Sequence, residues 1–196
     1  LSNGRLEAFS RKHQVPGEFV HSLIQDTEGN LWSGTYTAGL VRIKEAAVRS
    51  VTNAHGLPDR AVHAVLQDKK GDLWIGTDRK GLTQIRNRRV TRVWTTANGL
   101  EGNKVRVLHQ DPDQNIWVGT QSGLTLLQYV NGSYRASLSY NTAHGLVSPN
   151  ITAVFRDKNG IVWVGTEKGL HVRSRGAFKV FAPEFELAGK HIRAIA

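Results

Sequence analysis

The stretch DKKGDLWIGTDRKGL, residues 68–82, decides the fold because close copies of it occur four times in the chain. Its central Trp-x-Gly-Thr motif begins at Trp32, Trp74, Trp117 and Trp163, with spacings of 42, 43 and 46 residues. An aspartate stands six residues before each tryptophan, at Asp26, Asp68, Asp111 and Asp157. A further Gly-Leu landmark recurs at Leu57, Leu100 and Leu146. A period of about 40 residues is typical of architectures in which each repeat is one supersecondary unit.

Each repeat contains four short segments typical of β-strands. In the second copy they are residues 62–67, 73–77, 82–85 and 90–95, separated by turn residues. No window carries an apolar stripe at helical spacing, so the pattern favours strands throughout. Four strands in about 42 residues form one blade of a β-propeller. We therefore expect an all-β fold of four-stranded antiparallel blades.

The same register divides the chain into blades. It predicts the end of a preceding blade at 1–14, complete blades at 15–56, 57–99, 100–145 and 146–186, and the inner strand of a next blade at 187–196. Phe9, Val15 and Val20 fit this register at the front, and Phe181, Leu187 and Ile192 fit it at the back. Propellers close with roughly four to eight blades, so we expect this segment to belong to a larger propeller. The chain has no methionine, which agrees with a piece of a longer polypeptide.

Composition narrows the function classes. The absence of cysteine excludes disulfides, thiolate metal sites and a cysteine nucleophile. No run approaches the roughly 20 apolar residues that span a bilayer. The formal net charge of +10 favours anionic partners.

The residues that define the repeat are interpreted as structural. The aspartates begin turns, and the oxygen pattern of a calcium-binding loop is missing around them. The tryptophans lie in mid-strand, which favours buried wedges between blades over platforms for sugars. In Trp-x-Gly-Thr the glycine allows a neighbouring blade to approach, and the threonine hydroxyl fastens the following loop. The structural set is therefore Asp26, Trp32, Asp68, Trp74, Asp111, Trp117, Asp157 and Trp163.

Nothing in the sequence indicates catalysis, a cofactor or a metal. The eight histidines form no metal-ligand spacing, and His55 and His144 precede a Gly-Leu landmark, which indicates a role in turns. Neither a nucleophile-elbow motif nor a phosphate-binding loop is present. The cluster Arg86, Arg88, Arg89 and Arg92 falls on an outer hairpin, where it is interpreted as protection of a sheet edge. Nucleic-acid binding is disfavoured because only Trp94 lies near this cluster.

A candidate ligand site follows from the rotation that relates the blades. One position of the inner strand carries His21, His63, Arg106, Thr152 and Arg193 in successive repeats. Rotation about the propeller axis brings equivalent positions into a ring, and such a ring would favour an anion. Hydrogen bonding between blades explains the same residues and stays open as the alternative. Variable loops at the same end add the candidates Tyr36, Arg79, Lys80, Gln121 and Lys168.

The repeat Asp-x-x-Gly-x-Leu-Trp-Ile-Gly-Thr-x-x-x-Gly-Leu, residues 68–82, resembles the two-component regulator propeller repeat. The resemblance covers essentially the whole chain, although Ser33 and Gln114 depart from the pattern. It implies the extracytoplasmic, periplasmic sensor of a bacterial membrane receptor, built from a seven-bladed propeller. In such receptors a transmembrane helix and a histidine kinase, hybrid kinase or diguanylate cyclase follow, and the receptor is a homodimer. It also implies an oligosaccharide or another small ligand, which the charge makes anionic, and no nucleic acid.

Two other function classes stay open. Propeller lyases similar to virginiamycin lyase act on lactone antibiotics, and polysaccharide lyases or hydrolases act on acidic glycans. They use His, Arg and a metal on one face, so a metal on His21 and His63 would favour an enzyme. A protein-interaction scaffold would instead show a large exposed apolar patch at the same end.

Overall fold

The computed structural model describes residues 19–44, 47–87, 89–181 and 189–195. These residues form sixteen strands in four antiparallel sheets, and within each sheet the strands lie side by side in chain order. The first sheet contains β1 (Val20–Gln25), β2 (Leu31–Thr35), β3 (Leu40–Lys44) and β4 (Ala47–Val51). The second contains β5 (Val62–Gln67), β6 (Leu73–Thr77), β7 (Leu82–Arg86) and β8 (Arg89–Trp94). The third contains β9 (Val105–Gln110), β10 (Ile116–Thr120), β11 (Leu124–Val130) and β12 (Ser133–Tyr140). The fourth contains β13 (Ile151–Arg156), β14 (Val162–Thr166), β15 (Gly169–Ser174) and β16 (Ala177–Val180).

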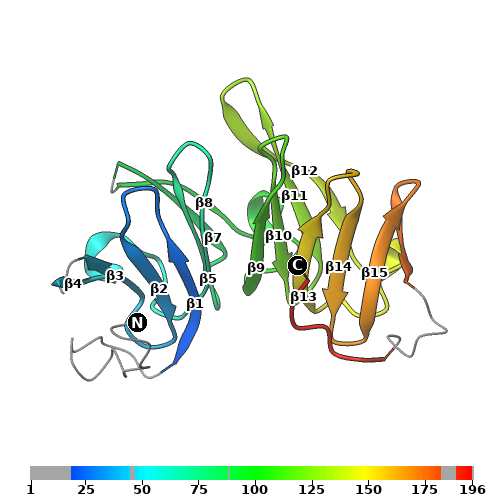
Figure 1. Cartoon of the computed structure of the whole chain (residues 1–196), viewed down its shortest axis with the longest axis horizontal. Helices are drawn as coiled ribbons and strands as arrows, with labels where there is room; N and C mark the ends of the chain where they lie inside the picture. Colours follow the sequence, from blue (N-terminus) through cyan, green and yellow to red (C-terminus); the bar gives the residue numbers. More distant parts are fainter. Residues whose placement is uncertain (1–18, 45–46, 88, 182–188, 196) are drawn as a thin grey trace, which may run out of the picture.

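The four sheets are arranged as propeller blades. In Figure 1 the inner strands β1, β5, β9 and β13 lie toward the middle of the molecule, while β4 and β15 lie on opposite flanks. Short 3-10 helices at Asn53–His55, Thr96–Asn98 and Thr142–His144 connect consecutive blades. His55 and His144 close these turns, since the Nδ1 atom of each accepts a backbone N–H three residues earlier. The predicted all-β propeller of four-stranded blades is confirmed.

The predicted blade fragments at the two ends are only partly described. The expected end of a preceding blade, residues 1–14, lies outside the described residues, as do Val15 and Leu187. In the expected inner strand at 187–196, residues 189–195 form no strand. Ile192 nevertheless donates its backbone N–H to the Thr166 carbonyl at 3.0 Å and packs against Gly165.

Each aspartate of the repeat fastens a turn and a tryptophan together. The Oδ1 atom of Asp68 accepts the backbone N–H groups of Lys70 at 2.9 Å and Asp72 at 3.0 Å. Its Oδ2 atom accepts the indole N–H of Trp74 at 2.9 Å, and this bond explains the constant spacing of six residues. The bond recurs from Trp32 to Asp26 at 2.7 Å, from Trp117 to Asp111 at 3.2 Å, and from Trp163 to Asp157 at 3.0 Å. The indole of Trp163 holds the pKa of Asp157 below its usual range.

The tryptophans pack between blades. Trp74 is fully buried and belongs to one cluster with Val105, Ile116 and Val118 of the third blade. Trp117 is 2% exposed and packs with residues of the fourth blade in the same way. Trp32 and Trp163, in the first and last blades, are half-buried. A wedge between blades therefore describes the two central tryptophans best.

Glycine and threonine of the motif have the expected structural roles. A Cβ atom added at Gly76 would lie 2.5 Å from Cγ1 of Val105 in the next blade. The Thr77 hydroxyl donates to the Gly81 carbonyl at 2.9 Å and accepts the Lys80 N–H at 3.1 Å, which fastens the loop between β6 and β7.

Polar side chains at the C-terminal ends of the inner strands also join consecutive blades. The Oε1 atom of Gln67 accepts the Thr27 N–H at 2.9 Å, and that of Gln110 accepts the Lys69 N–H at 2.8 Å. Arg156 occupies the corresponding place in the fourth blade and pairs with Asp111 at 3.3 Å and with Asp113. The last residue of β5, β9 and β13 therefore contacts the aspartate turn of the preceding blade in each case, although the residue type differs.

Two histidines, the buried His171 and the half-buried His109, predict that the fold loses stability in mild acid. The Nε2 atom of His171 accepts the Val147 N–H at 3.1 Å, and that of His109 accepts the Arg156 N–H at 3.2 Å, so both act as neutral acceptors. Burial lowers the pKa of each below 6.5. The unfolded chain thus binds more protons below about pH 6.5, and the free energy of unfolding should fall as pH drops below that value. Urea unfolding at a series of pH values checks this, and H171Q, which keeps an acceptor but does not titrate, should flatten the dependence. An unchanged slope in H171Q would remove His171 from this explanation.

Candidate functional site

A pocket of about 290 Å³ lies where the inner strands of the four blades converge. We call it the hub pocket, and it is lined by His21, His63, Arg106, Thr152, His191 and Arg193. Four of these residues are the second residues of β1, β5, β9 and β13, and the other two belong to the C-terminal segment. The fold therefore brings together all five positions of the predicted ring, from parts of the sequence about 43 residues apart.

The rings of His21 and His63 lie against each other at the hub pocket. Their ring centroids are 4.5 Å apart, with an angle of 45° between the planes. Burial, and then repulsion by His63, lower the pKa of His21 below its ordinary value of 6.5. His21 is therefore neutral at pH 7 and adds positive charge to the pocket only in more acidic solution.

Asp78 orients His63 from the loop between β6 and β7. Its Oδ1 atom lies 2.8 Å from Nε2 of His63 and 2.5 Å from Nζ of Lys104. Burial alone would raise the pKa of Asp78, but the hydrogen bonds from Lys104 and His63 hold it below the usual range. Nε2 of His63 is occupied by this contact.

Arg106 is the strongest candidate for an anion contact. Its side chain is one-third exposed, and its Nε atom is buried without a hydrogen-bond partner among the described residues. The nearest carboxylate oxygen, on Glu167, is 4.0 Å from its Nη1 atom, which is too far for a hydrogen bond. Glu167 instead accepts a hydrogen bond from Asn150 at 2.5 Å. The guanidinium of Arg106 thus retains donors for a ligand.

Thr152 differs from the other ring positions because its hydroxyl is engaged. It donates to the Ile192 carbonyl and so holds the C-terminal segment against β13. This contact places His191 and Arg193, both exposed, at the pocket. Here the alternative explanation, hydrogen bonding between neighbouring segments, describes the residue.

None of the predicted loop residues lines the hub pocket. The Tyr36 ring is 5.9 Å from that of His21 and 6.3 Å from that of His63. Arg79 pairs with Asp59 at 3.5 Å and is otherwise exposed. Lys80, Gln121 and Lys168 are exposed on the corresponding loops.

The candidate site residues from the sequence do not include three residues of the site: Asp78 and Lys104, which the sequence places only in loops at this end, and His191. Asp78, like Tyr36 and Glu167, directly follows the threonine of its repeat. Lys104 lies two residues before the ring position Arg106, and His191 lies two residues before the ring position Arg193. Comparing these two positions across the repeats, in the same way as the ring position, would have identified all three residues.

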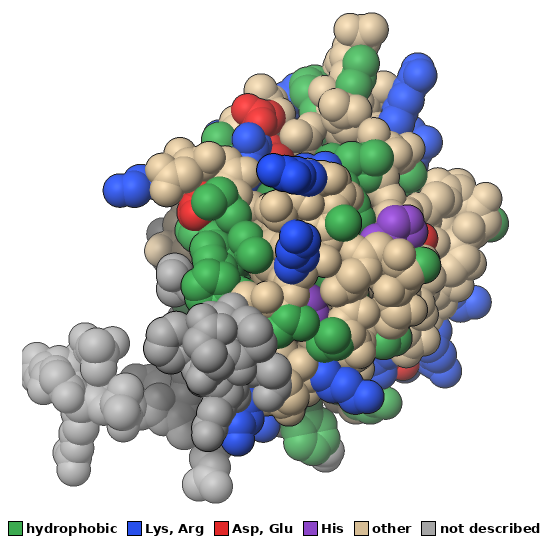
Figure 2. All heavy atoms as spheres, turned by 90° about the vertical axis from the view of Figure 1, so that its right-hand side faces the viewer, with side chains coloured by type: hydrophobic (Ala, Val, Ile, Leu, Met, Phe, Trp, Pro, Cys, Tyr) green, Lys and Arg blue, Asp and Glu red, His purple; other side chains and the backbone are tan. Residues whose placement is uncertain are grey.

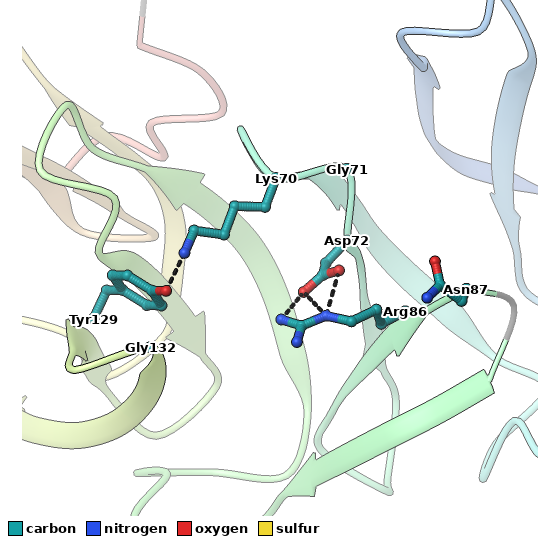
Figure 3. Close-up of a pocket in the computed structure, with 7 residues that line it drawn as sticks. All are labelled: Lys70, Gly71, Asp72, Arg86, Asn87, Tyr129 and Gly132. Atoms are coloured by element: carbon teal, nitrogen blue, oxygen red, sulfur yellow. Dashed lines mark hydrogen bonds and ion pairs between the residues drawn. The ribbon is translucent and has the colours of Figure 1, made fainter.

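A second pocket, of about 320 Å³, opens between the second and third blades at the end with the aspartate turns (Figure 3). Its charged groups are already engaged within the protein. Nε and Nη2 of Arg86 donate to the Asp72 carboxylate at 2.7–3.0 Å, and the Lys70 ammonium contacts the Tyr129 hydroxyl and ring. The hub pocket, with its free guanidinium donors, is therefore the better candidate.

Two classes of site are not found among the residues that the structure describes. They contain no group of three or more His, Cys, Asp or Glu side chains placed to hold a metal ion. None of their helices is both apolar enough and long enough for a membrane span.

Comparison with known families matches the repeat itself. The model of the two component regulator propeller matches residues 14–37, 56–79, 99–122 and 145–168. Each match covers an inner strand, the aspartate turn and the Trp-x-Gly-Thr strand, so the family model recognises the segments described above. No curated protein matches the chain.

Solved structures of similar fold include sensor domains and enzymes. The extracellular domain of BT3049 from B. thetaiotaomicron, assigned as a hybrid two component system, is 26% identical with a TM-score of 0.75, over 90% of this chain and 25% of that one. The extracellular domain of BT4673 from the same organism is 20% identical with a TM-score of 0.70, over 91% and 25%. Virginiamycin B lyase from Staphylococcus aureus is 13% identical with a TM-score of 0.62, over 83% and 55%.

The similarities to the sensor domains and to the lyase differ in how much they show about this chain. This chain spans about a quarter of the two sensor domains and about half of the lyase. The likeness to the lyase shows the fold alone, and the segment fits a regulatory propeller and not a catalytic one. With four matched repeats that coincide with its four blades, the chain belongs to the two component regulator propeller family.

Proposed function

We propose that this chain is the ligand-sensing part of an extracytoplasmic propeller in a bacterial membrane receptor, and that its hub pocket binds a small anionic ligand such as an acidic saccharide. The family and the likeness to extracellular domains of two component systems support the first part. The whole receptor would be a membrane-anchored homodimer with a histidine kinase or diguanylate cyclase output, on the periplasmic side of the inner membrane.

One observation carries the second part: the hub pocket gathers side chains from all four inner strands and the C-terminal segment. Its cationic groups are Arg106 and Arg193. A volume of about 290 Å³ is at the lower end for small-molecule sites, which suits a ligand of one or two sugar units. A carboxylate suits the fork of donors on Arg106.

The geometry also supports a way of sensing. A ligand at the hub touches every blade at once, so it binds best to one arrangement of the blades. Binding can shift the receptor only as far as the affinities for its two states differ.

Calorimetric titration with galacturonate and digalacturonate, and with galactose and galactobiose as neutral counterparts, tests the proposal. We expect the acidic sugars to bind at least about tenfold more tightly, because a charge-assisted bidentate contact contributes about 1.5–3 kcal/mol. R106Q should remove most of that difference, while K158Q, at an exposed turn far from the hub, should leave it unchanged. Equal binding of neutral and acidic sugars, or an effect of K158Q equal to that of R106Q, would contradict an anion site at the hub.

A further inference from the structure

The net positive charge of the chain resides on its outer hairpins. We define the outer band as these hairpins, residues 40–51, 82–94, 124–140 and 169–180, which are the third and fourth strands of each blade with their turns. The outer band contains eleven of the 26 Lys and Arg residues but only one of the 16 acidic residues, Glu45. The rest of the chain has fifteen of each sign, so the whole net charge of +10 belongs to the outer band. The charge of the chain therefore says nothing about the ligand of the hub pocket.

The cations of the outer band are available to a partner. Six of them are exposed and make no side-chain hydrogen bond or ion pair with a described residue: Lys44, Arg49, Arg89, Arg135, Arg175 and Lys179. The exceptions include Arg86, which pairs with Asp72, and Arg92, which lies 4.9 Å from the Trp94 ring. Figure 2 shows the flank of the last blade, where blue Lys and Arg side chains are spread over the surface and red Asp and Glu side chains are few.

Protection of sheet edges explains only part of this arrangement. A few lysines or arginines are enough to prevent pairing between edges, and acidic residues serve the purpose as well. A band with eleven basic residues and only one acidic residue over four consecutive repeats is instead typical of a surface that binds anions.

The geometry of the outer band favours one kind of polyanion. In Figure 1 β4 of the first blade and β15 of the last blade lie on opposite flanks of the molecule, with β8 and β12 between them, so the cations of different blades face different directions. A flat bilayer can touch only one or two blades at a time, whereas a flexible chain can follow the curve. Of the aromatic residues of the outer band, Trp94, Tyr134, Tyr140 and Phe178 are at most 3% exposed. Tyr129 on β11 is half-buried, and the Lys70 ammonium lies 3.6 Å from the centre of its ring. The outer band therefore offers no open platform for nucleobases.

We propose that the outer band is an electrostatic docking surface for a linear acidic polysaccharide, separate from the hub pocket. The polymer is held through its carboxylate or sulfate groups, one blade after another. Such binding is weak at each blade and gains strength from several blades acting together. It would concentrate the polymer from which small acidic fragments arise next to the hub.

Binding of the 196-residue chain to polygalacturonate, with neutral dextran of the same length as a control, tests this proposal. We expect binding to polygalacturonate that weakens steeply as salt is raised, and none to dextran. The double variant R89E/R135E, on neighbouring blades, should weaken binding at least about tenfold and make the salt dependence shallower. The matched pair K80E/K158E changes the net charge equally at exposed positions outside the outer band and should change affinity less than about twofold.

Every other outcome overturns the proposal. Equal losses in both pairs would mean that total charge decides, and no loss in either would exclude the outer band. If phosphatidylglycerol vesicles or single-stranded DNA instead bound as tightly as polygalacturonate, with the same loss of affinity in R89E/R135E, that result would identify another class of partner. R106Q separates this proposal from the hub site, because it should remove most of the preference for galacturonate over galactose and leave polygalacturonate binding intact.

Discussion

Replacing Gly76 with alanine is expected to lower the free energy of unfolding by about 3 kcal/mol or more, a large part of the roughly 5–15 kcal/mol that stabilises a typical folded protein. The new Cβ atom would lie 2.5 Å from Cγ1 and 3.0 Å from Cβ of Val105 and 3.2 Å from Cβ of Ala64. Val105 is fully buried and β-branched, so it has no rotamer that relieves the overlap. The second and third blades would have to separate.

Urea unfolding followed by tryptophan fluorescence measures this loss. G132A is the matched control, since that glycine has a positive φ of 84° but nothing within 4 Å of an added Cβ, and it should cost only about 1 kcal/mol. The double variant G76A/V105A should recover part of the loss because it removes the atom that causes the overlap. If V105A gave no recovery, contact between the blades would not be the reason for glycine at this position.

Replacing Asp68 with asparagine is expected to cost about 2–4 kcal/mol of stability, although the side chain keeps its shape. The asparagine oxygen can still accept the turn amides, but its NH₂ group would face the indole N–H of Trp74 and the Tyr134 hydroxyl, which lies 3.3 Å from Oδ2 of Asp68. Asp68 is 3% exposed, so water cannot replace the lost acceptor. Burial and the Asp68 carboxylate also raise the pKa of Tyr134, in agreement with a neutral hydroxyl that donates here.

Thermal and urea unfolding of D68N, W74F and the double variant separate the indole bond from the rest of the effect. The double variant should lose less than the sum of the single variants, because W74F removes the donor that D68N leaves without a partner. The equivalent D157N variant should lose less than D68N, since Asp157 is more exposed. Additive losses in the cycle would show that the indole bond contributes nothing specific.

The fold could be predicted from sequence because its determinants recur. The four strands of the second blade follow the predicted segments closely, and the extra length of the third repeat lies in the β11–β12 hairpin. The three 3-10 helices were not predicted, since a single turn of three residues leaves no periodic pattern. Gln114 shows how strictly the turn is kept, as it adopts a φ of 68° where the other repeats have glycine.

The candidate site was predictable only as far as rotation about the propeller axis determines it. His21, His63, Arg106, Thr152 and Arg193 meet because equivalent positions must meet. The pairing of Asp78 with His63 and Lys104 depends on the path of one loop and on side-chain rotamers, which vary between repeats. The engagement of Thr152 by the Ile192 carbonyl likewise depends on a segment without regular structure.

Contacts between neighbouring blades make the molecule a one-dimensional array of coupled units. The inner strands touch in sequence, β1 with β5, β5 with β9 and β9 with β13, so a disturbance in one blade reaches distant blades only through those in between. The hub pocket is the exception, since His21 of the first blade and Arg193 at the far end line the same space. A ligand bound there would add direct coupling between units that are otherwise remote and turn a chain of pairwise links into a cooperative whole.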